Sequence, residues 1–304
     1  MKKVLGIVVV VILTFTISKL FIFSVPEEVN SDDTNQKNIN NEYRVFALNI
    51  PENIDFAGEQ VPLNILDVRE RFDKELLVNT YWQSQGLLFF KRANKYFPEI
   101  EKILKERGVP DDFKYLALIE SGLVNVTSPA GAKGFWQLMP KTAREHGLEV
   151  NRNIDERYDY IKATKTACDY ILKAKEKFGS WTSAAASYNM GMRGVSREFE
   201  RQKVTNYYDL LLNDETSRYL FRVLAIKSIF ENPKQYGFHF REKDLYSMPK
   251  LKEVKIDSTI VDLADFAISQ GINYKELKLY NPWLREIKLN NKTKRKYTLK
   301  ILVK

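Results

Sequence analysis

Glu120 is the residue of this sequence whose surroundings best suit acid chemistry. It ends a short apolar stretch, and spacings of three and four residues place Phe113, Leu116 and Glu120 on one face of a helix. Burial among apolar side chains disfavours a charged carboxylate and raises its pKa. A carboxylic acid that is still protonated near neutral pH can act as a general acid, for example toward a glycosidic oxygen. The alternative is a structural glutamate at the rim of a hydrophobic core.

A compact motif downstream of this glutamate offers groups that suit a saccharide ligand. It reads SPAGAKGFWQLMP from Ser128, and the Gln137 amide in it can bridge sugar hydroxyl and acetamido groups. We expect Phe135, Trp136 and Met139 to supply apolar surface for pyranose faces. For Phe135 and Trp136 the alternative is that the side chain fills the core.

A second motif, AAASYNMG, begins at Ala184. Its three alanines allow another element to approach closely, which would bring Tyr188 and Asn189 near Glu120. We expect the Tyr188 hydroxyl to hydrogen-bond the Glu120 carboxyl group, and Asn189 to contact the substrate. The same letters also suit a packed, alanine-rich helix that ends at a glycine.

The elements that must position these groups are mainly helices. A proline and two aspartates at 110–112 and a glycine at 122 predict a helix around the apolar stretch that ends at Glu120. Apolar periodicity predicts further helices at 67–80, 82–96, 98–107, 155–178 and 215–230. The charged segment 193–203 either lines the outer edge of a groove or forms a solvated helix face.

Taken together, Glu120-Ser121-Gly122 and the two motifs that follow it resemble the lytic transglycosylases of the soluble-lytic-transglycosylase type, and within them the membrane-bound lytic murein transglycosylase D group. The order and spacing of the motifs carry this resemblance, which extends over about 67–240. It implies a mainly α-helical, lysozyme-like catalytic domain. One departure is the pair Phe135-Trp136, where many members have leucine and methionine before the glutamine.

The resemblance implies a reaction without a nucleophile and without a metal or other cofactor. Glu120 would protonate the oxygen between N-acetylmuramic acid and N-acetylglucosamine. The muramic acid C6 hydroxyl would then attack C1 and return its proton to Glu120, leaving a 1,6-anhydro end. A hydrolytic lysozyme, or a glycan-binding wall protein without activity, is the alternative. The implied substrate-binding residues are Ser128, Gln137, Met139, Tyr188, Asn189 and Glu215.

Glu215 is the nearest candidate for a second acid, because ordinary glycosidases use two carboxylates. Its other interpretation is the first-turn acid of a helix, where the helix dipole favours negative charge.

The composition and net charge of the chain indicate which kinds of molecule it can bind. The chain has 304 residues and a net charge of +9, which suits anionic partners such as peptidoglycan with its stem-peptide carboxylates. No nucleic-acid-binding module is recognisable, so we expect no nucleic-acid partner. The single cysteine, Cys168, excludes an internal disulfide and is expected in the core.

The N-terminal segment has the pattern of an export signal. Two lysines precede an almost uncharged stretch that reaches residue 25, long enough to span a bilayer. We expect a membrane anchor at 1–25 that is not cleaved, with a cleaved signal peptide as the alternative. The catalytic domain would then lie in the periplasm or otherwise outside the cytoplasmic membrane. Residues 26–66 are expected to form a polar tether followed by an extended strap.

The C-terminal part of the chain is predicted to be a small second module. After a linker at 241–251, residues 252–304 suggest the order strand, helix, helix, strand, at 254–257, 260–270, 274–280 and 297–303. This order is similar to a LysM module, a βααβ fold that binds the N-acetylglucosamine units of glycan chains. A basic loop at 290–296 either contacts anionic wall polymer or lipid head groups, or is simply solvated.

Overall fold

The computed structural model describes residues 45–304 of the chain. The anchor or signal peptide expected at 1–25 and most of the expected tether lie outside the described residues. Between residues 45 and 304, no helix has the length and apolar character needed to cross a membrane.

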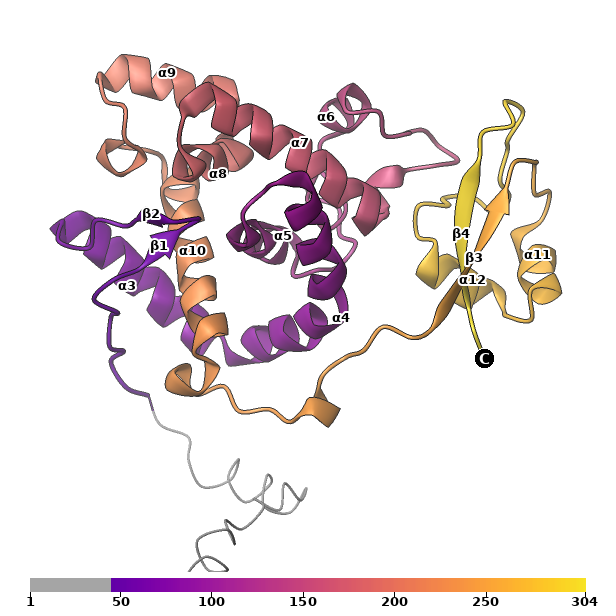
Figure 1. Ribbon diagram of the computed structural model, residues 1–304, viewed down its shortest axis with the longest axis horizontal. Helices are drawn as coiled ribbons and strands as arrows, with labels where there is room; N and C mark the ends of the chain where they lie inside the picture. The colour runs from indigo at the N-terminus through magenta and orange to yellow at the C-terminus, as the bar shows by residue number, and fades with distance from the viewer. Residues whose placement is uncertain (1–44) are drawn as a thin grey trace, which may run out of the picture. The chain divides into compact units, whose positions relative to one another are not determined.

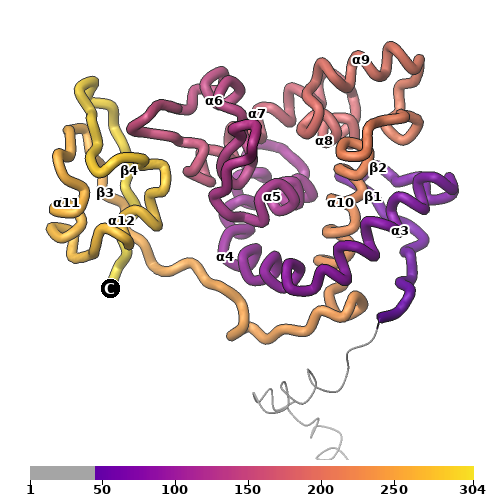
Figure 2. Tube along the Cα trace, turned by 180° about the vertical axis from the view of Figure 1, so that it is seen from behind, coloured from indigo at the N-terminus to yellow at the C-terminus, as the bar shows by residue number. Residues whose placement is uncertain are grey.

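The larger of two hydrophobic cores is built by helices. They are α3 (Leu66–Tyr81), α4 (Gln83–Arg107), α5 (Lys114–Ser121), α6 (Pro140–Glu145), α7 (Tyr160–Phe178), α8 (Trp181–Met190), α9 (Met192–Gln202) and α10 (Asp214–Glu231). The short α5 contacts both α4 and α10 and lies between them (Figure 1, Figure 2). The expected mainly α-helical class is confirmed, and Cys168 is buried on α7 as expected.

One long helix, α4, replaces the two helices expected at 82–96 and 98–107. Pro98 lies inside it. A proline in a helix removes one backbone hydrogen bond. Here Phe97 and Ile100 on either side are buried in the core, so packing of the apolar face continues across the proline.

The helix expected at 155–178 is divided at its start. Asp155 precedes a 3-10 turn at Glu156–Tyr158, and α7 begins only after Asp159. The Asp159 carboxylate accepts hydrogen bonds from the first backbone N–H groups of α7, so this second aspartate is the helix cap.

A small hairpin occupies the region where only an extended strap was expected. It consists of β1 (Asp55–Phe56) and β2 (Glu59–Gln60), which pair antiparallel. The Glu59 carboxylate accepts hydrogen bonds from the backbone N–H groups of Trp181 at 2.6 Å and Thr182 at 2.8 Å. Burial raises the pKa of Glu59, but these donors outweigh it and hold the pKa at about 2. The hairpin therefore fixes the start of α8, which carries the AAASYNMG motif.

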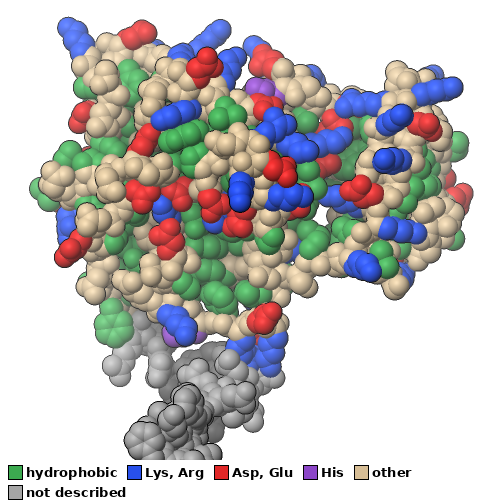
Figure 3. All heavy atoms as spheres, viewed as in Figure 1, with side chains coloured by type: hydrophobic (Ala, Val, Ile, Leu, Met, Phe, Trp, Pro, Cys, Tyr) green, Lys and Arg blue, Asp and Glu red, His purple; other side chains and the backbone are tan. Residues whose placement is uncertain are grey.

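The smaller core belongs to a βααβ unit near the C-terminus. Its elements are β3 (Leu251–Ile256), α11 (Leu263–Ser269), α12 (Tyr274–Tyr280) and β4 (Tyr297–Leu302). The two strands pair antiparallel, and alternate residues of β4 face the core. Residues 251–304 contain twelve Lys or Arg and six Asp or Glu. Figure 3 shows several of the basic side chains on the visible face of this unit.

Candidate active site

Glu120 lies in the last turn of α5, at the edge of the larger core. Phe113 and Leu116 are fully buried on the same side, and Glu120 itself is half-buried. Gly122 ends the helix in the left-handed region, at φ 62°. From α10, the Tyr219 hydroxyl donates a hydrogen bond of 2.7 Å to Glu120 Oε1. As expected, the Glu120 carboxyl group lies beside apolar side chains.

The electrostatic surroundings of Glu120 raise the pKa of its carboxyl group into the neutral range. Burial raises the pKa of Glu120, while the hydrogen bond from Tyr219 and the positive charge of Arg222 lower it, and the negative charge of Glu215 raises it. The net effect is a shift from the ordinary value of 4.5 to about 7. Glu120 can therefore hold or release a proton near neutral pH, as a group that serves as acid and then as base must.

Tyr188 does not hydrogen-bond Glu120, and that expectation is wrong. Its hydroxyl donates instead to the backbone carbonyl oxygen of Trp136 at 2.8 Å. Burial raises the pKa of Tyr188 and the charge of Glu120 adds to this, so the two side chains are neighbours. Tyr188 therefore supports the loop that carries Gln137. The hydrogen bond to Glu120 that was expected from Tyr188 comes from Tyr219 instead. The signal for Tyr219 was a hydroxyl on the apolar face of α10, since buried tyrosines usually have a hydrogen-bond partner.

Gln137 and Ser128 are both half-buried, and both hold their own loop together. Gln137 has φ 44°, and its side-chain nitrogen donates to the backbone oxygens of Gly134 at 2.8 Å and Val126 at 3.3 Å. Its Oε1 accepts no hydrogen bond from residues 45–304. The Ser128 hydroxyl oxygen accepts from the Ala132 backbone N–H at 3.0 Å.

The two aromatic residues before Gln137 belong to the core. Phe135 and Trp136 are 3% and 0% exposed, and Trp136 Nε1 donates to the Thr164 hydroxyl at 2.8 Å. The expectation that they offer apolar surface to a sugar is therefore wrong, and core filling is the correct alternative. Met139 is 43% exposed and is the residue of this group that a ligand can reach.

Asn189 and Glu215 lie side by side. Asn189 Nδ2 donates to Glu215 Oε1 at 3.4 Å. Glu215 is exposed in the first turn of α10, which Asn213 caps, so it has the position of a first-turn acid. Its effect on the Glu120 pKa also places it near that carboxyl group. The structure thus brings Glu120, Asn189 and Glu215 together from three different helices.

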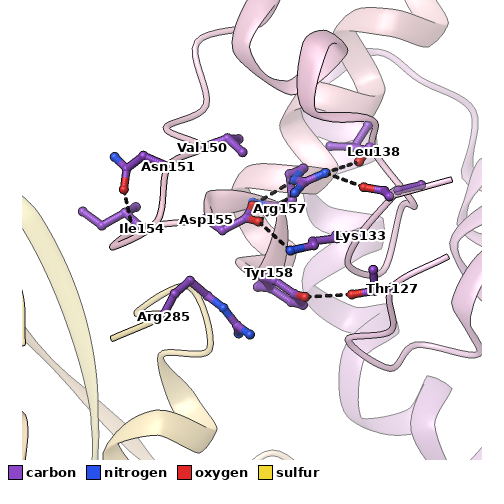
Figure 4. A network of polar contacts seen from close by, with 12 residues as sticks. Thr127, Lys133, Leu138, Val150, Asn151, Ile154, Asp155, Arg157, Tyr158 and Arg285 are labelled. Carbon is purple, nitrogen blue, oxygen red and sulfur yellow. Dashed lines mark hydrogen bonds and ion pairs between the residues drawn. The ribbon is translucent and has the colours of Figure 1, made fainter. Parts of the chain in front are cut away.

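A buried ion pair holds the loop of the first motif in place (Figure 4). Asp155 accepts from Arg157 Nε at 2.9 Å and Nη2 at 2.8 Å, and both side chains are almost fully buried. Arg157 Nη1 also donates to the backbone oxygens of Gly131 at 2.9 Å and Leu138 at 3.1 Å. Lys133 adds a second ion pair to Asp155 at 3.6 Å. One guanidinium group therefore ties together both ends of the loop that carries Gln137.

Comparison with solved structures finds several similar chains, among them two lytic transglycosylases. One is the 70 kDa soluble lytic transglycosylase SLT70 of Escherichia coli, with a TM-score of 0.38 and 20% identity, over 46% of this chain and 25% of that chain. The other is an inactive mutant of lytic transglycosylase Slt from Pseudomonas aeruginosa, with a TM-score of 0.37 and 19% identity, over 50% of this chain and 26% of that chain.

Comparison of sequences finds relatives of known type. The chain is 31% identical over 235 residues to membrane-bound lytic murein transglycosylase D of Escherichia coli (strain K12), over 74% of this chain and 50% of the relative. It spans about half the length of the curated relatives it matches. Residues 97–211 match the transglycosylase SLT domain family, and residues 252–303 match the soluble lytic transglycosylase C-terminal LysM-like domain family. The chain therefore contains a transglycosylase SLT domain followed by a soluble lytic transglycosylase C-terminal LysM-like domain.

Proposed function

We propose that this protein is a peptidoglycan lytic transglycosylase. It cleaves the β-1,4 bond between N-acetylmuramic acid and N-acetylglucosamine without water and leaves 1,6-anhydro ends. The observation that carries this proposal is the Glu120 carboxyl group, half-buried in the SLT domain with its pKa raised to about 7. The similarity to a membrane-bound lytic murein transglycosylase supports the substrate class.

Glu120 acts first as an acid and then as a base. The protonated form gives its proton to the glycosidic oxygen, and an oxocarbenium-like sugar forms as the bond breaks. The charge of Arg222 and the Tyr219 hydrogen bond both favour the carboxylate that remains, because both lower the Glu120 pKa. The C6 hydroxyl of the same sugar then attacks C1 and gives its proton to Glu120, which returns the enzyme to its starting state.

The polar groups around Glu120 are proposed to bind the sugar chain. Gln137 contributes the free Oε1 as an acceptor, and Met139 contributes exposed apolar surface. Asn189 and Glu215 act as a hydrogen-bonded pair beside the carboxyl group. Ser128 and Tyr188 are proposed to contact the same sugar chain, and each also supports its loop.

A hydrolytic reaction on the same scaffold is the second candidate. Glu215 favours it, because a second carboxylate near the acid is the arrangement that hydrolytic glycosidases use. In that reaction water takes the place of the C6 hydroxyl group, and the product is a reducing end rather than an anhydro end.

The proposed setting is the cell envelope. Residues 1–25 would anchor the chain in a membrane and 26–66 would link the anchor to a catalytic domain at 67–240 outside the cytoplasmic membrane. After a linker at 241–251, the LysM-like domain at 252–304 would bind glycan chains of the same wall. Mass spectrometry of the mature N-terminus tests the anchor.

The reaction is tested with Glu120→Gln on purified sacculi. We expect wild-type protein to release 1,6-anhydro muropeptides without incorporating ¹⁸O from labelled water. The variant should release them at least about 100-fold more slowly, which is the lower range for loss of general acid–base catalysis. Glu145→Gln is the matched control, because Glu145 is 59% exposed on α6. Release by Glu120→Gln at the wild-type rate would contradict the proposal, and ¹⁸O incorporation by the wild type would favour hydrolysis.

A further inference from the structure

A second pocket lies where the LysM-like domain meets the SLT domain. Its cavity volume is about 100 Å³, so it can enclose only part of a larger ligand, such as one carboxylate-bearing end group. Its walls come from α4, from the segment before α7, from α12 and from β4. Glu120, Gln137 and Tyr188 do not line it. The pocket is therefore separate from the candidate active site.

Aromatic side chains from both domains form the pocket walls. Phe135 and Tyr160 of the SLT domain stack with ring centroids 5.6 Å apart. Tyr96 meets both of these rings edge-on, at 4.8 and 5.3 Å. Tyr280 and Trp283 face them from the LysM-like domain. Phe135 and Trp283 are buried, so a sugar ring or short peptide can reach only the half-buried rings of Tyr96, Tyr160 and Tyr280.

Two lysines add positive charge to these walls. Lys95 Nζ lies 5.2 Å from the centre of the Tyr96 ring, and Lys300 Nζ lies 4.9 Å from the centre of the Tyr160 ring. Within residues 45–304 neither ammonium group forms an ion pair, and burial lowers the pKa of Lys95. The one acid in the lining is Asp159, whose carboxylate also accepts the hydrogen bond that caps α7.

Further donors in the pocket have no protein partner. The hydroxyl groups of Tyr96, Tyr160 and Tyr280 and the indole N–H of Trp283 hydrogen-bond no group in the described part of the chain. By contrast, the hydroxyl of Tyr158, which also lines the pocket, pairs with Thr127 at 3.0 Å. The pocket thus combines aromatic side chains, hydrogen-bond donors without a partner in the described part of the chain, and two lysines against one aspartate.

We infer that this pocket binds a carboxylate-bearing muropeptide unit, with the sugar or peptide against the aromatic rings and a carboxylate between Lys95 and Lys300. This inference rests on peptidoglycan being the substrate. The pocket also shares a wall with the active site, because the Phe135 carbonyl oxygen accepts a hydrogen bond of 2.9 Å from Ser121, the neighbour of Glu120. A glycan strand held here has a raised effective concentration at the active site.

The test uses the double variant Lys95→Gln/Lys300→Gln in the full chain, placed in a Glu120→Gln background so that no ligand is consumed. Calorimetry measures the Kd of a disaccharide tetrapeptide, of the same compound with amidated carboxylates, and of the uncharged disaccharide of two N-acetylglucosamine units. We expect the double variant to bind the tetrapeptide about tenfold or more weakly, from the loss of charge-assisted hydrogen bonds. Amidation should cause the same loss in the parent protein. Binding of the uncharged disaccharide should not change in the double variant.

The control carries the same charge change at exposed positions, Lys102→Gln/Lys292→Gln, one in each domain. Unchanged tetrapeptide affinity in the double variant, or an equal loss in the control, would overturn the inference. Absence of tetrapeptide binding to the parent protein would overturn it too. The proposed reaction is tested separately. It fails if protein with an intact Glu120 releases no anhydro muropeptides from sacculi.

Discussion

Glu120 is held between two opposing influences on its proton. Burial at the end of α5 favours the neutral acid, while the Tyr219 hydroxyl and Arg222 favour the carboxylate. Neither state is overwhelmingly preferred near pH 7, so the same side chain can serve in both halves of the proposed reaction. The acid is needed in the first step, and kcat/KM should therefore fall as the pH rises through the pKa of Glu120.

Tyr219→Phe tests this balance. Loss of the hydrogen bond removes an influence that lowers the Glu120 pKa, so the pKa should rise further and the alkaline limb of kcat/KM should move to higher pH. We also expect kcat to fall about tenfold, as for loss of a hydrogen bond to a charged group. Tyr188→Phe is the control, since that hydroxyl pairs with a backbone oxygen. A shift of the limb in Tyr188→Phe and none in Tyr219→Phe would contradict the assignment.

The position of Glu120 could be predicted from the sequence, but its hydrogen-bond partner Tyr219 could not. Spacing along one helix is a local property, and it was sufficient to place Glu120 beside Leu116. Whether Tyr188 or Tyr219 reaches the carboxyl group depends on how α8 and α10 pack against α5, which no local pattern contains. The burial of Trp136 was undecided for the same reason, because its partner Thr164 lies on α7.

Individual elements are positioned by buried polar contacts that periodicity does not reveal. The loop of the first motif depends on Arg157, and Gly134 in that loop has φ 80° and lies against the Arg157 backbone. A Cβ atom at Gly134 would stand 1.9 Å from the Arg157 carbonyl oxygen. The glycine is therefore required by close packing as well as by its backbone conformation.

Arg157→Ala should destabilise the fold and displace the loop. It leaves the Asp155 carboxylate buried without its main partner, which typically costs about 3–5 kcal/mol of unfolding free energy. Chemical denaturation measures this, and KM for sacculi should rise because Gln137 loses its position. Arg152→Ala is the control. The Arg152 side chain is 93% exposed, so its ion pair with Glu286 should contribute less than about 1 kcal/mol to the unfolding free energy. Equal effects of the two substitutions would contradict the role of Arg157.

The start of α10 followed the sequence, because Asn213 caps the helix and apolar periodicity follows. The bounds of α3 lie within one residue of the expected 67–80, although no side chain caps that helix. Other boundaries departed from the sequence pattern where a tertiary contact outweighed a local signal. Packing around Pro98 continued α4, and the contact between Glu59 and the start of α8 stabilised a hairpin too short to show a strand pattern.

At the scale of the whole molecule, the segment at 149–158 joins the two domains. Ile154 and Tyr158 belong to the smaller core, although both lie in the SLT part of the chain. The Asp155 backbone N–H donates to the Trp283 carbonyl oxygen at 2.9 Å, and Arg285 stacks over the Tyr158 ring at 4.2 Å. The two domains therefore share buried surface and backbone hydrogen bonds.

The basic loop at 290–296 takes part in the same junction. Arg295 forms ion pairs with Glu149 at 2.9 Å and Glu156 at 3.5 Å. The expectation of a simply solvated or ligand-binding loop did not include this contact. Charge along the sequence showed that the loop is basic, but its acidic partners lie about 140 residues earlier in the chain, beyond the reach of a local pattern.

Because of this shared core, the two domains should unfold together. We expect a single calorimetric transition for residues 45–304, and Ile154→Ala should lower the unfolding free energy by about 2–5 kcal/mol. The matched control is Ile268→Ala on α11, whose side chain is 70% exposed. Two separate transitions in the unmodified chain would show that the junction contributes little to stability.

The protonation of Glu120 is the claim on which the proposed chemistry depends. Carbon-13 NMR of protein with labelled glutamate follows its carboxyl carbon with pH, and Glu120→Gln identifies the resonance. We predict a midpoint near pH 7, where the ordinary value is 4.5. A midpoint close to 4.5 would show a carboxylate that is already ionised in neutral solution and would contradict the assignment of Glu120 as the acid.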